Sequence, residues 1–304
     1  MTIRTSSYNS RPADGARVRT DPELQQDPVI RGTTRLLAHL GDPIAPVKSP
    51  AIYNPYFERK AIDVVVVPMG VSPDDYPVTL RAVFRLTNML GAIITMPHKR
   101  STVALLDECS PRVRVAGACN AIVRRPDGTL FGDLFDGLGF VRGLARNGFQ
   151  VAGSRGLVIG AGGAGSAIAA ALATAGAGAL AIHDIAPHHT QALVARLREH
   201  HPHLDAIAGS NDPSGFDLVV NASSLGMIAD GHLPVEISRL PATAFVAEVV
   251  MTPEVTPLLA AARARGCRTQ PGIDMLFEQI PLYLEFFGLG PASSEELRAV
   301  ARLT

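Results

Sequence analysis

The sequence of 304 residues contains no tryptophan, only three cysteines and no excess of either charge. Lysine plus arginine and aspartate plus glutamate both total 28, so the formal net charge is zero. A neutral chain offers no bulk electrostatic attraction to nucleic acid or to an anionic membrane surface. No apolar run reaches the roughly 20 residues that a membrane-spanning helix needs. These absences argue against nucleic acid and membranes as partners.

The few cysteines also restrict the chemistry. Cys109, Cys119 and Cys267 lack the spacing of metal ligands and leave an odd thiol. Reduced thiols in a cytoplasmic protein are the simplest interpretation, and the N-terminus shows no secretory apolar segment. Histidines gather at residues 188–189 and 200–203, on either side of one amphipathic segment, which favours exposed helix ends over a metal site. We therefore predict a cytoplasmic protein without a metal.

Short apolar runs alternate with amphipathic segments over most of the chain, as strands and helices do. Predicted strands lie at Leu36–Leu40, Asp63–Val67, Ala92–Thr95, Asn120–Val123, Leu157–Gly160, Ala179–Asp184, Asp205–Ala208, Leu218–Asn221 and Ala244–Val249. Predicted helices include Val78–Leu90, Lys99–Glu108, Gly137–Asn147, Ser166–Ala175 and Gly272–Phe287. Because this alternation favours parallel strands with right-handed crossovers, and the length suggests two domains, we predict a two-domain α/β fold.

A glycine-rich turn at Gly160–Gly165 follows the apolar strand at Leu157 and opens a helix. It matches the pattern G-x-G-x-x-G, and the next predicted strand ends in Asp184. In this context the pattern is typical of a dinucleotide-binding Rossmann domain. The first glycine permits the turn, the second admits the pyrophosphate, and the third lets helix and strand pack closely. The helix N-terminus offers free N–H groups to the phosphates.

Two charged residues upstream of this turn are candidates for catalysis. Lys99 follows the predicted strand that ends at Thr95, and Asp136 stands where an extended segment turns into a helix. Open α/β sheets bind ligands at the carboxyl ends of their strands. Oxidation of an alcohol by a nicotinamide also moves the hydroxyl proton, which a lysine oriented by a carboxylate can exchange. The pair therefore suits a dehydrogenase, although either residue alone could be a solvated charge.

Eight ordered motifs between Gly32 and Gly288 resemble the shikimate dehydrogenase family, which includes quinate/shikimate dehydrogenases. They comprise residues 41–50, Thr95–Lys99, Gly117–Asn120, Asp136–Phe140, Gly160–Gly165, Asn221–Met227, Thr256–Leu259 and Gly272–Gln279. The resemblance implies an N-terminal α/β substrate domain and a C-terminal Rossmann domain. It also implies a CH–OH oxidoreductase that serves aromatic amino acid biosynthesis.

The resemblance further implies roles for individual residues. Lys99 and Asp136 would form the catalytic dyad. Ser49, Thr95, Asn120 and Gln279 would contact the hydroxyl and carboxylate groups of the substrate. The nucleotide would contact Gly160, Ala161, Gly162, Gly163, Ala164, Gly165, Asp184, Asn221, Ser223 and Gly272. For Ser49 and Thr95 helix capping is the alternative, since both precede helix starts.

The chain departs from the family pattern mainly in the substrate pocket. The family motif H-S-x-S-P, whose serines hold the substrate carboxylate, here has Val47 in place of one serine. Where the family has N-V-T, this chain has Ile93 in place of the asparagine. Where the family has N-T-D-G, it has Leu134 and Phe135 in place of the asparagine and the threonine. Met251 replaces a tyrosine near the nicotinamide. Each lost contact to a buried polar group costs about 1–3 kcal/mol, so we predict poor shikimate turnover or a different substrate. In the alternative, Lys48, Arg100 or a backbone N–H replaces the lost contact.

Asp184 determines the expected nucleotide. A carboxylate at this strand end accepts hydrogen bonds from the ribose hydroxyls and repels a 2′-phosphate. NADP-specific relatives carry an arginine in the following residues, whereas no lysine or arginine occurs between Ala186 and Val194. The sequence therefore predicts NAD in preference to NADP.

We expect an NAD-dependent dehydrogenase acting on shikimate, quinate or a related hydroxylated cyclic carboxylate, with a homodimer as the assembly to test. Residues 1–28, rich in Ser, Arg, Asp and Pro, are expected to form a mobile extension. Residues 29–140 with 273–304 would form the substrate and catalytic domain, and 141–272 the NAD-binding Rossmann domain. One alternative is an NAD-binding sensor or scaffold that has lost turnover. A folate-type methylene dehydrogenase is another alternative, but that class does not share the motif at Asp136–Phe140.

Overall fold

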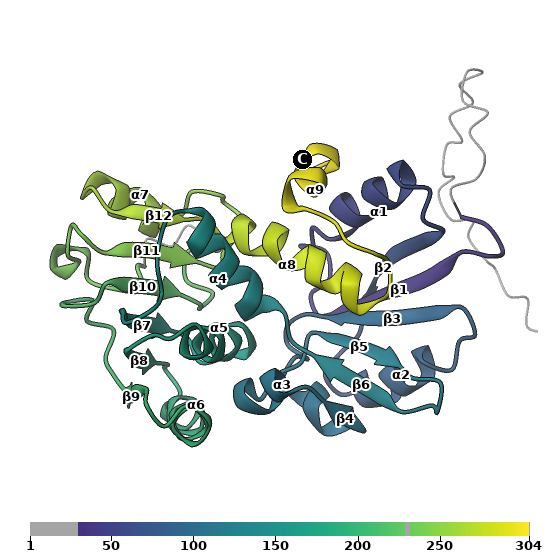
Figure 1. The fold of residues 1–304 in the computed structure, drawn as a ribbon, viewed down its shortest axis with the longest axis horizontal. Coiled ribbons are helices and arrows are strands. Elements are labelled where there is room, and N and C mark those ends of the chain that lie inside the picture. Colours follow the sequence, from purple (N-terminus) through teal and green to yellow (C-terminus); the bar gives the residue numbers. More distant parts are fainter. Residues whose placement is uncertain (1–29, 229–231, 304) are drawn as a thin grey trace, which may run out of the picture.

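A computed structural model describes residues 30–228 and 232–303, so the predicted extension over residues 1–28 lies outside the described chain. These described residues form two six-stranded sheets. The strand order is β2-β1-β3-β5-β6-β4 in the first and β12-β11-β10-β7-β8-β9 in the second. The two sheets and their helices form two lobes, which Figure 1 shows next to each other. The predicted α/β class is confirmed.

The first lobe consists of the sheet β1–β6 with helices α1–α3. Its strands are β1 (Arg35–Gly41), β2 (Val64–Gly70), β3 (Met89–Ile94), β4 (Glu108–Cys109), β5 (Ala121–Arg124) and β6 (Leu130–Asp133). Its helices are α1 (Pro50–Arg59), α2 (Tyr76–Val83) and α3 (Pro111–Ala116), with a short 3-10 helix at Ser101–Leu105. The helices predicted over residues 78–90 and 99–108 are therefore shorter than expected.

The first sheet is not parallel throughout, which corrects the prediction of parallel strands. Strand β5 pairs antiparallel with both β3 and β6. The connection from β5 to β6 covers only residues 125–129, in which Asp127 Oδ1 accepts a hydrogen bond from the Thr129 N–H at 2.9 Å. A parallel pair needs a crossover of about a dozen residues or more, so this link can only make a hairpin.

The second lobe consists of the sheet β7–β12, parallel in all its pairs, with helices α5–α7. Its strands are β7 (Arg155–Ile159), β8 (Ala179–His183), β9 (Asp205–Ala208), β10 (Leu218–Asn221), β11 (Phe245–Glu248) and β12 (Arg268–Gln270). Its helices are α5 (Gly163–Thr174), α6 (Pro187–His200) and α7 (Pro257–Ala264), with a 3-10 turn at Ile237–Arg239. The order, with β7 central, is that of a Rossmann sheet.

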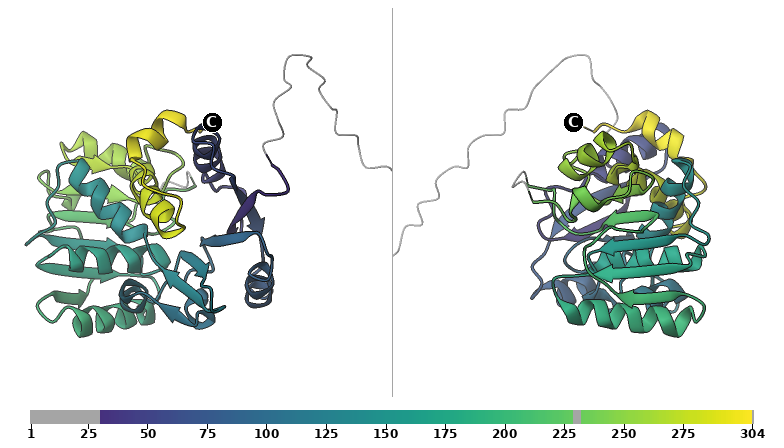
Figure 2. Two further views of the ribbon diagram at one scale, coloured as in Figure 1. Left: turned by 45° about the vertical axis from the view of Figure 1, so that its right-hand side comes forward. Right: turned by 90° about the vertical axis from the view of Figure 1, so that its left-hand side faces the viewer.

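Helices α4 (Asp136–Arg146) and α8 (Gly272–Phe286) pack against each other between the lobes (Figures 1 and 2). Glycines allow their close approach. A Cβ atom on Gly137 would lie 2.1 Å from the carbonyl oxygen of Ala167 in α5. A Cβ atom on Gly139 would lie 2.7 Å from the carbonyl oxygen of Met275 in α8. The start of α4 is thus held between a helix of the second lobe and α8.

Two further contacts tie distant segments together. Arg196 of α6 donates hydrogen bonds to the carbonyls of Val115 (2.9 Å) and Ala116 (3.1 Å), the last residues of α3. Helix α9 (Ser294–Val300) returns to the first lobe and packs on α1 (Figure 1). There the Arg302 N–H donates to the Ala51 carbonyl at 2.8 Å. In the described residues no helix combines the length and apolarity needed to cross a membrane.

Candidate active site

The predicted dyad is an ion pair at the junction of the two lobes. Lys99 Nζ donates a hydrogen bond to Asp136 Oδ2. Lys99 lies in the turn after β3, and Asp136 is the first residue of α4, shortly after β6. The lysine side chain is 15% exposed and the aspartate side chain 3% exposed, so the ammonium can reach a ligand while the carboxylate stays behind it. The carboxyl ends of strands in one sheet thus bring the two residues together.

The dyad lies directly against the glycine-rich turn. A Cβ atom on Gly163 would be 3.0 Å from Lys99 Cβ and 3.2 Å from Lys99 Cδ. Gly163 is the first residue of α5, so the aliphatic part of Lys99 packs on the N-terminus of that helix. A group bound at this turn would therefore be next to the lysine. This contact joins the two motifs that the sequence showed separately.

Two glycines of the turn, Gly160 and Gly165, are required by the backbone. Gly160 has φ +102°, which favours glycine, and a Cβ on Gly165 would be 1.9 Å from the Gly160 carbonyl oxygen. Around Gly162, the N-cap of α5, a Cβ would meet no atom of the described chain within 4 Å. Open space beside the N-terminus of a helix is the geometry that receives a phosphate.

Two buried amides near the dyad carry atoms without a hydrogen-bond partner in the described chain. They are Asn120 Nδ2, a donor, and Gln279 Oε1, an acceptor. The amide oxygen of Asn120 accepts from the Phe135 N–H at 3.0 Å, which fixes the orientation of the side chain just before Asp136. An unsatisfied buried polar atom costs about 1–3 kcal/mol, so both atoms suit a ligand that donates and accepts.

Ser49 occupies the N-cap position of α1, but its hydroxyl makes no capping bond in the described chain. Instead it is hydrogen bonded to Nδ1 of His39 on β1, which is 7% exposed. Burial, together with the positive charge of Lys99, lowers the pKa of His39 to about 3. His39 was not among the residues singled out from the sequence. The only sign of it in the sequence was that His39 is the one polar residue within the apolar run Leu36–Leu40.

Two further pocket positions, Thr95 and Phe135, lie at the ends of strands of the first sheet. Thr95 follows β3, where its N–H donates to the Leu40 carbonyl at 2.9 Å. Phe135, which replaces a family hydroxyl, is buried at 4% exposure. Its ring contacts those of Tyr283 and Phe286 of α8, with centroids 5.1 Å and 5.4 Å away. Phe135 therefore fixes α8 against the start of α4.

Asn221, at the end of β10, organises the loop that follows it. Its Oδ1 accepts from the Ser223 N–H (3.1 Å) and hydroxyl (2.6 Å). Its Nδ2 donates to the Leu225 carbonyl (2.9 Å) and to Glu248 Oε2 (3.2 Å). Burial raises the pKa of Glu248, while hydrogen bonds from Thr256 and Asn221 oppose this rise. Asn221 thus shapes the loop through its side chain.

Gly272, the first residue of α8, lies too close to neighbouring backbone atoms to carry a side chain. A Cβ atom there would lie 2.4 Å from the Val250 carbonyl oxygen. The glycine therefore lets α8 start against the end of the second sheet.

Asp184 is engaged with the backbone of its own turn. Its Oδ2 accepts from the Ala161 N–H at 2.7 Å, and its Oδ1 accepts from the Ala186 N–H at 2.8 Å. Burial alone would raise the pKa of this carboxyl, but the two backbone donors, with His189 and His183, hold it below its usual value. The acid therefore has a structural reason to be there that is independent of a ribose.

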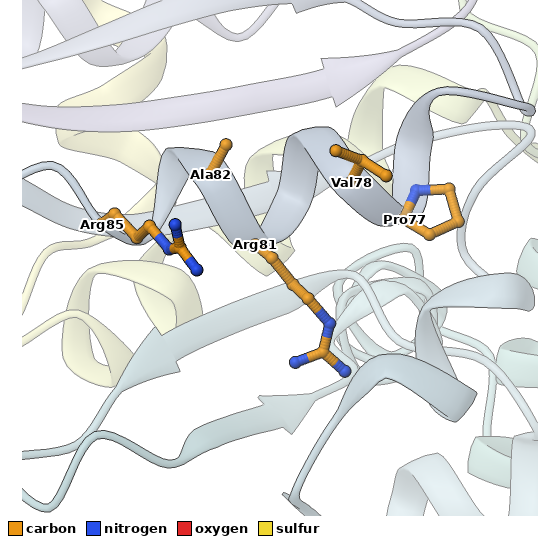
Figure 3. Close-up of a pocket in the computed structure, with 5 residues that line it drawn as sticks. All are labelled: Pro77, Val78, Arg81, Ala82 and Arg85. Atoms are coloured by element: carbon orange, nitrogen blue, oxygen red, sulfur yellow. The ribbon is translucent and has the colours of Figure 1, made fainter.

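A separate shallow hollow of about 320 Å³ lies on α2 and contains none of the predicted site residues (Figure 3). It is lined by Pro77, Val78, Arg81 and Ala82 of α2 and by Arg85 in the turn that follows the helix. The three cysteines are free thiols, and burial raises the pKa of Cys119 to about 12. The absence of a metal in the protein stays a prediction.

A two-lobed α/β fold with an ion pair against a dinucleotide turn is typical of oxidoreductases that act on CH–OH groups. The chain belongs to the shikimate dehydrogenase family. A model of the shikimate dehydrogenase substrate binding domain matches residues 40–122. A shikimate dehydrogenase (NADP(+)) of Acidiphilium cryptum is 36% identical over 276 residues, 90% of this chain and 98% of the relative.

Solved structures agree with this assignment. The shikimate 5-dehydrogenase of Thermus thermophilus, in complex with NADP(H) and shikimate, is 28% identical, with a TM-score of 0.79, over 88% of this chain and 99% of its own. The ligand-free 5-ketofructose reductase of a Gluconobacter strain is 27% identical, with a TM-score of 0.78, over 88% of this chain and 98% of its own.

The comparisons correct the prediction of NAD as the preferred nucleotide. The curated relative from Acidiphilium cryptum and further relatives at 34–35% identity are named as NADP(+) enzymes. The prediction treated Asp184 as a free carboxylate facing the ribose. In the structure both of its oxygens accept backbone N–H groups, so closing its own turn is enough to account for an acid at this strand end.

Proposed function

We propose that this protein is an NADP(H)-dependent dehydrogenase that interconverts a ring hydroxyl and a ketone of shikimate, quinate or a related hydroxylated cyclic carboxylate. The observation that carries the proposal is the partly buried Lys99–Asp136 pair, with Lys99 packed on Gly163 at the start of α5. Residues 29–140 with 273–304 would form the substrate domain, and 141–272 the nucleotide-binding domain.

The dyad suits proton exchange at the reacting oxygen. When bound, NADP(H) accepts or supplies the hydride. Lys99 can give a proton to the ketone oxygen as an ammonium and take the hydroxyl proton back as the neutral amine, because its amino end is partly exposed while its aliphatic part is fixed by Gly163. Asp136 orients the ammonium and balances its charge from the interior. General acid–base catalysis of this kind contributes about 10²–10⁴-fold to a rate.

The substrate groups match the free polar atoms around the dyad. We propose that Asn120 Nδ2 donates to an oxygen of the substrate and that Gln279 Oε1 accepts from a substrate hydroxyl. Both atoms are buried and without a partner in the described chain. Ser49 and Thr95 would add hydroxyls at the ends of neighbouring elements. Such alternation of donors and acceptors fits a ring with adjacent hydroxyls.

The nucleotide would lie along the turn Gly160–Gly165, with its pyrophosphate at the open space beside Gly162. Asn221 and Ser223 would act by holding the loop after β10, and Gly272 by seating α8. Asp184 would act by closing the turn at Ala161. A cytoplasmic homodimer remains part of the proposal, and light scattering of the purified chain tests the dimer.

Steady-state kinetics with NADP and either shikimate or quinate test the proposal. Lys99→Ala should lower kcat by about 10²–10⁴-fold while the dissociation constant of NADP, measured by calorimetry, stays within about threefold. Lys60→Ala is the matched control, because Lys60 forms an exposed ion pair with Glu296 at 2.8 Å on the surface of the first lobe. A Lys99→Ala enzyme with wild-type kcat would refute the assigned role.

A neutral polyhydroxy ketone is the second candidate substrate. Val47 removes one of the hydroxyls expected at the carboxylate, and the solved relative from Gluconobacter is a 5-ketofructose reductase. A shikimate kcat/KM below about 10⁵ M⁻¹s⁻¹ together with fast reduction of 5-ketofructose by NADPH would favour this substrate. Nucleotide binding without turnover of any of these compounds would favour the sensor or scaffold instead.

A further inference from the structure

His39 is a buried polar residue at the carboxyl end of β1 for which the dyad chemistry has no assigned use. It pairs in register with Ile93 of β3, which in turn pairs with Ala121 of β5. Residues in such a row point to the same face of a sheet. Ile93 stands where the family pattern has an amide, so the polar group missing from β3 is matched by an imidazole on the next strand.

The contact that His39 makes leads directly to a predicted substrate residue. Its Nδ1 is hydrogen bonded to the hydroxyl of Ser49, ten positions later in the chain. That hydroxyl is not used to cap α1 in the described chain, although Ser49 occupies the N-cap position. The bond to His39 therefore fixes the rotation of the Ser49 hydroxyl, which a capping bond would otherwise do.

The imidazole is held in its neutral form. Burial lowers the pKa of His39 to about 3, and the charge of Lys99 adds to this effect. A neutral imidazole carries one N–H donor and one acceptor nitrogen, so its tautomer decides which way the bond to Ser49 runs. If Nδ1–H donates, the Ser49 proton is free for a ligand. In the other tautomer the Ser49 hydroxyl donates to Nδ1 of the ring and has no proton left for a ligand.

We propose that His39 is a positioning residue that donates from Nδ1 to the Ser49 oxygen and so directs the Ser49 proton to the carboxylate of the substrate. The inference rests on the proposed function. With Val47 in place of a second hydroxyl, Ser49 is the remaining serine of that motif and must donate to hold a carboxylate. A chain of two hydrogen bonds in the same direction is strengthened by mutual polarisation, and the buried imidazole adds no charge beside Lys99.

Substitutions at both ends of the pair test this arrangement. His39→Leu removes the donor, and we expect it to raise the KM for shikimate or quinate by about tenfold while kcat stays within about threefold. His39→Asn, whose amide nitrogen can take the place of Nδ1, should restore KM to within about threefold of wild type. Ser49→Ala should match His39→Leu, and the double variant should be no worse than Ser49→Ala alone.

The methyl ester of shikimate separates an effect on the carboxylate from a general loss of packing. The ester lacks the negative charge, so His39→Leu should leave its KM within about twofold of the wild-type value for the same compound. A direct measurement does not depend on substitution. Nitrogen-15 NMR of the histidine rings in the non-reacting wild-type complex with NADPH and shikimate, assigned with His39→Asn, should show His39 protonated at Nδ1.

The outcomes distinguish failure of this inference from failure of the proposed function. Additive effects of the two substitutions, an equal rise in KM for the ester, or protonation of His39 at Nε2 would overturn the inference in an enzyme that remains active. Activity confined to the neutral 5-ketofructose would also overturn it, although the dehydrogenase assignment would stand. A wild-type protein that turns over none of these compounds would overturn both.

Discussion

Replacing Gly137 with alanine should damage catalysis through the packing of α4 on α5. The new Cβ would lie 2.1 Å from the Ala167 carbonyl oxygen, whereas ordinary contacts begin near 3.4 Å. The two helices would therefore have to separate by about 1 Å. Asp136 precedes Gly137, and Lys99 rests on Gly163 at the start of α5, so this separation falls between the members of the dyad.

A misplacement of about 1 Å in a catalytic group costs about 10²-fold in rate. We therefore expect Gly137→Ala to lower kcat/KM by about 10²-fold. Overpacking should also destabilise the fold by about 1–3 kcal/mol, offset in part by the gain of about 1 kcal/mol in helix propensity. Steady-state kinetics and urea unfolding of the same preparation measure the two effects.

Gly143→Ala is the matched control, because it lies in the same helix but away from the dyad. Its Cβ would meet the amide end of the Gln270 side chain at 3.0 Å, which a small rotation can move, instead of a backbone oxygen. We expect its kcat/KM to stay within about threefold of wild type. Wild-type kcat/KM in Gly137→Ala, or a loss of activity in both variants in proportion to stability, would contradict this expectation.

Three further predictions concern groups that hold the frame of the site. Asp184→Asn should lower the unfolding temperature of the protein without nucleotide. Because the folded pKa of Asp184 is lowered from 3.8, the difference from wild type should shrink as the pH falls below about 3.8. A difference that does not change with pH would contradict the role of Asp184 in closing the turn. Arg196→Ala should destabilise the protein by about 1–3 kcal/mol in urea unfolding, since it removes both donors to the C-terminal carbonyls of α3, and an unchanged midpoint would refute that. Burial raises the folded pKa of Glu248 above 4.5. The stability of the wild type should therefore fall relative to that of Glu248→Gln as the pH rises from 4.5 towards neutral. A difference in unfolding temperature that is the same at every pH would refute the raised pKa.

The second sheet could be predicted almost strand by strand, because buried parallel strands are short apolar runs. Runs such as Leu218–Asn221 and Phe245–Glu248 are apolar throughout or nearly so. The missed strands lack that signal. Strand β12 has the polar sequence Arg-Thr-Gln at a sheet edge, and β6 contains a glycine and an aspartate. Their pairing depends on neighbours that are distant in sequence.

The same limit applies to the site. Lys99 and Asp136 could be proposed as a pair because each follows an extended segment before a turn, and the structure places them in contact. The bond of His39 to Ser49 had no signal in the spacing of the residues. Asp184 was misinterpreted because a strand-end acid looks the same whether it binds a ribose or the backbone of its own turn. The names of the relatives as NADP(+) enzymes, and not a property of the residue, overturned that prediction.

The return of the chain to α1 has a consequence for recombination between relatives. Helix α9 follows the second lobe in sequence, yet its neighbour Arg302 bonds to Ala51, and Glu296 pairs with Lys60. A chimera with one crossover between the lobes would join one parent's α1 to the other parent's α9. A functional exchange of nucleotide-binding halves therefore needs two crossovers, the second after β12. Helices α1 and α9, which contact each other, then both come from one parent.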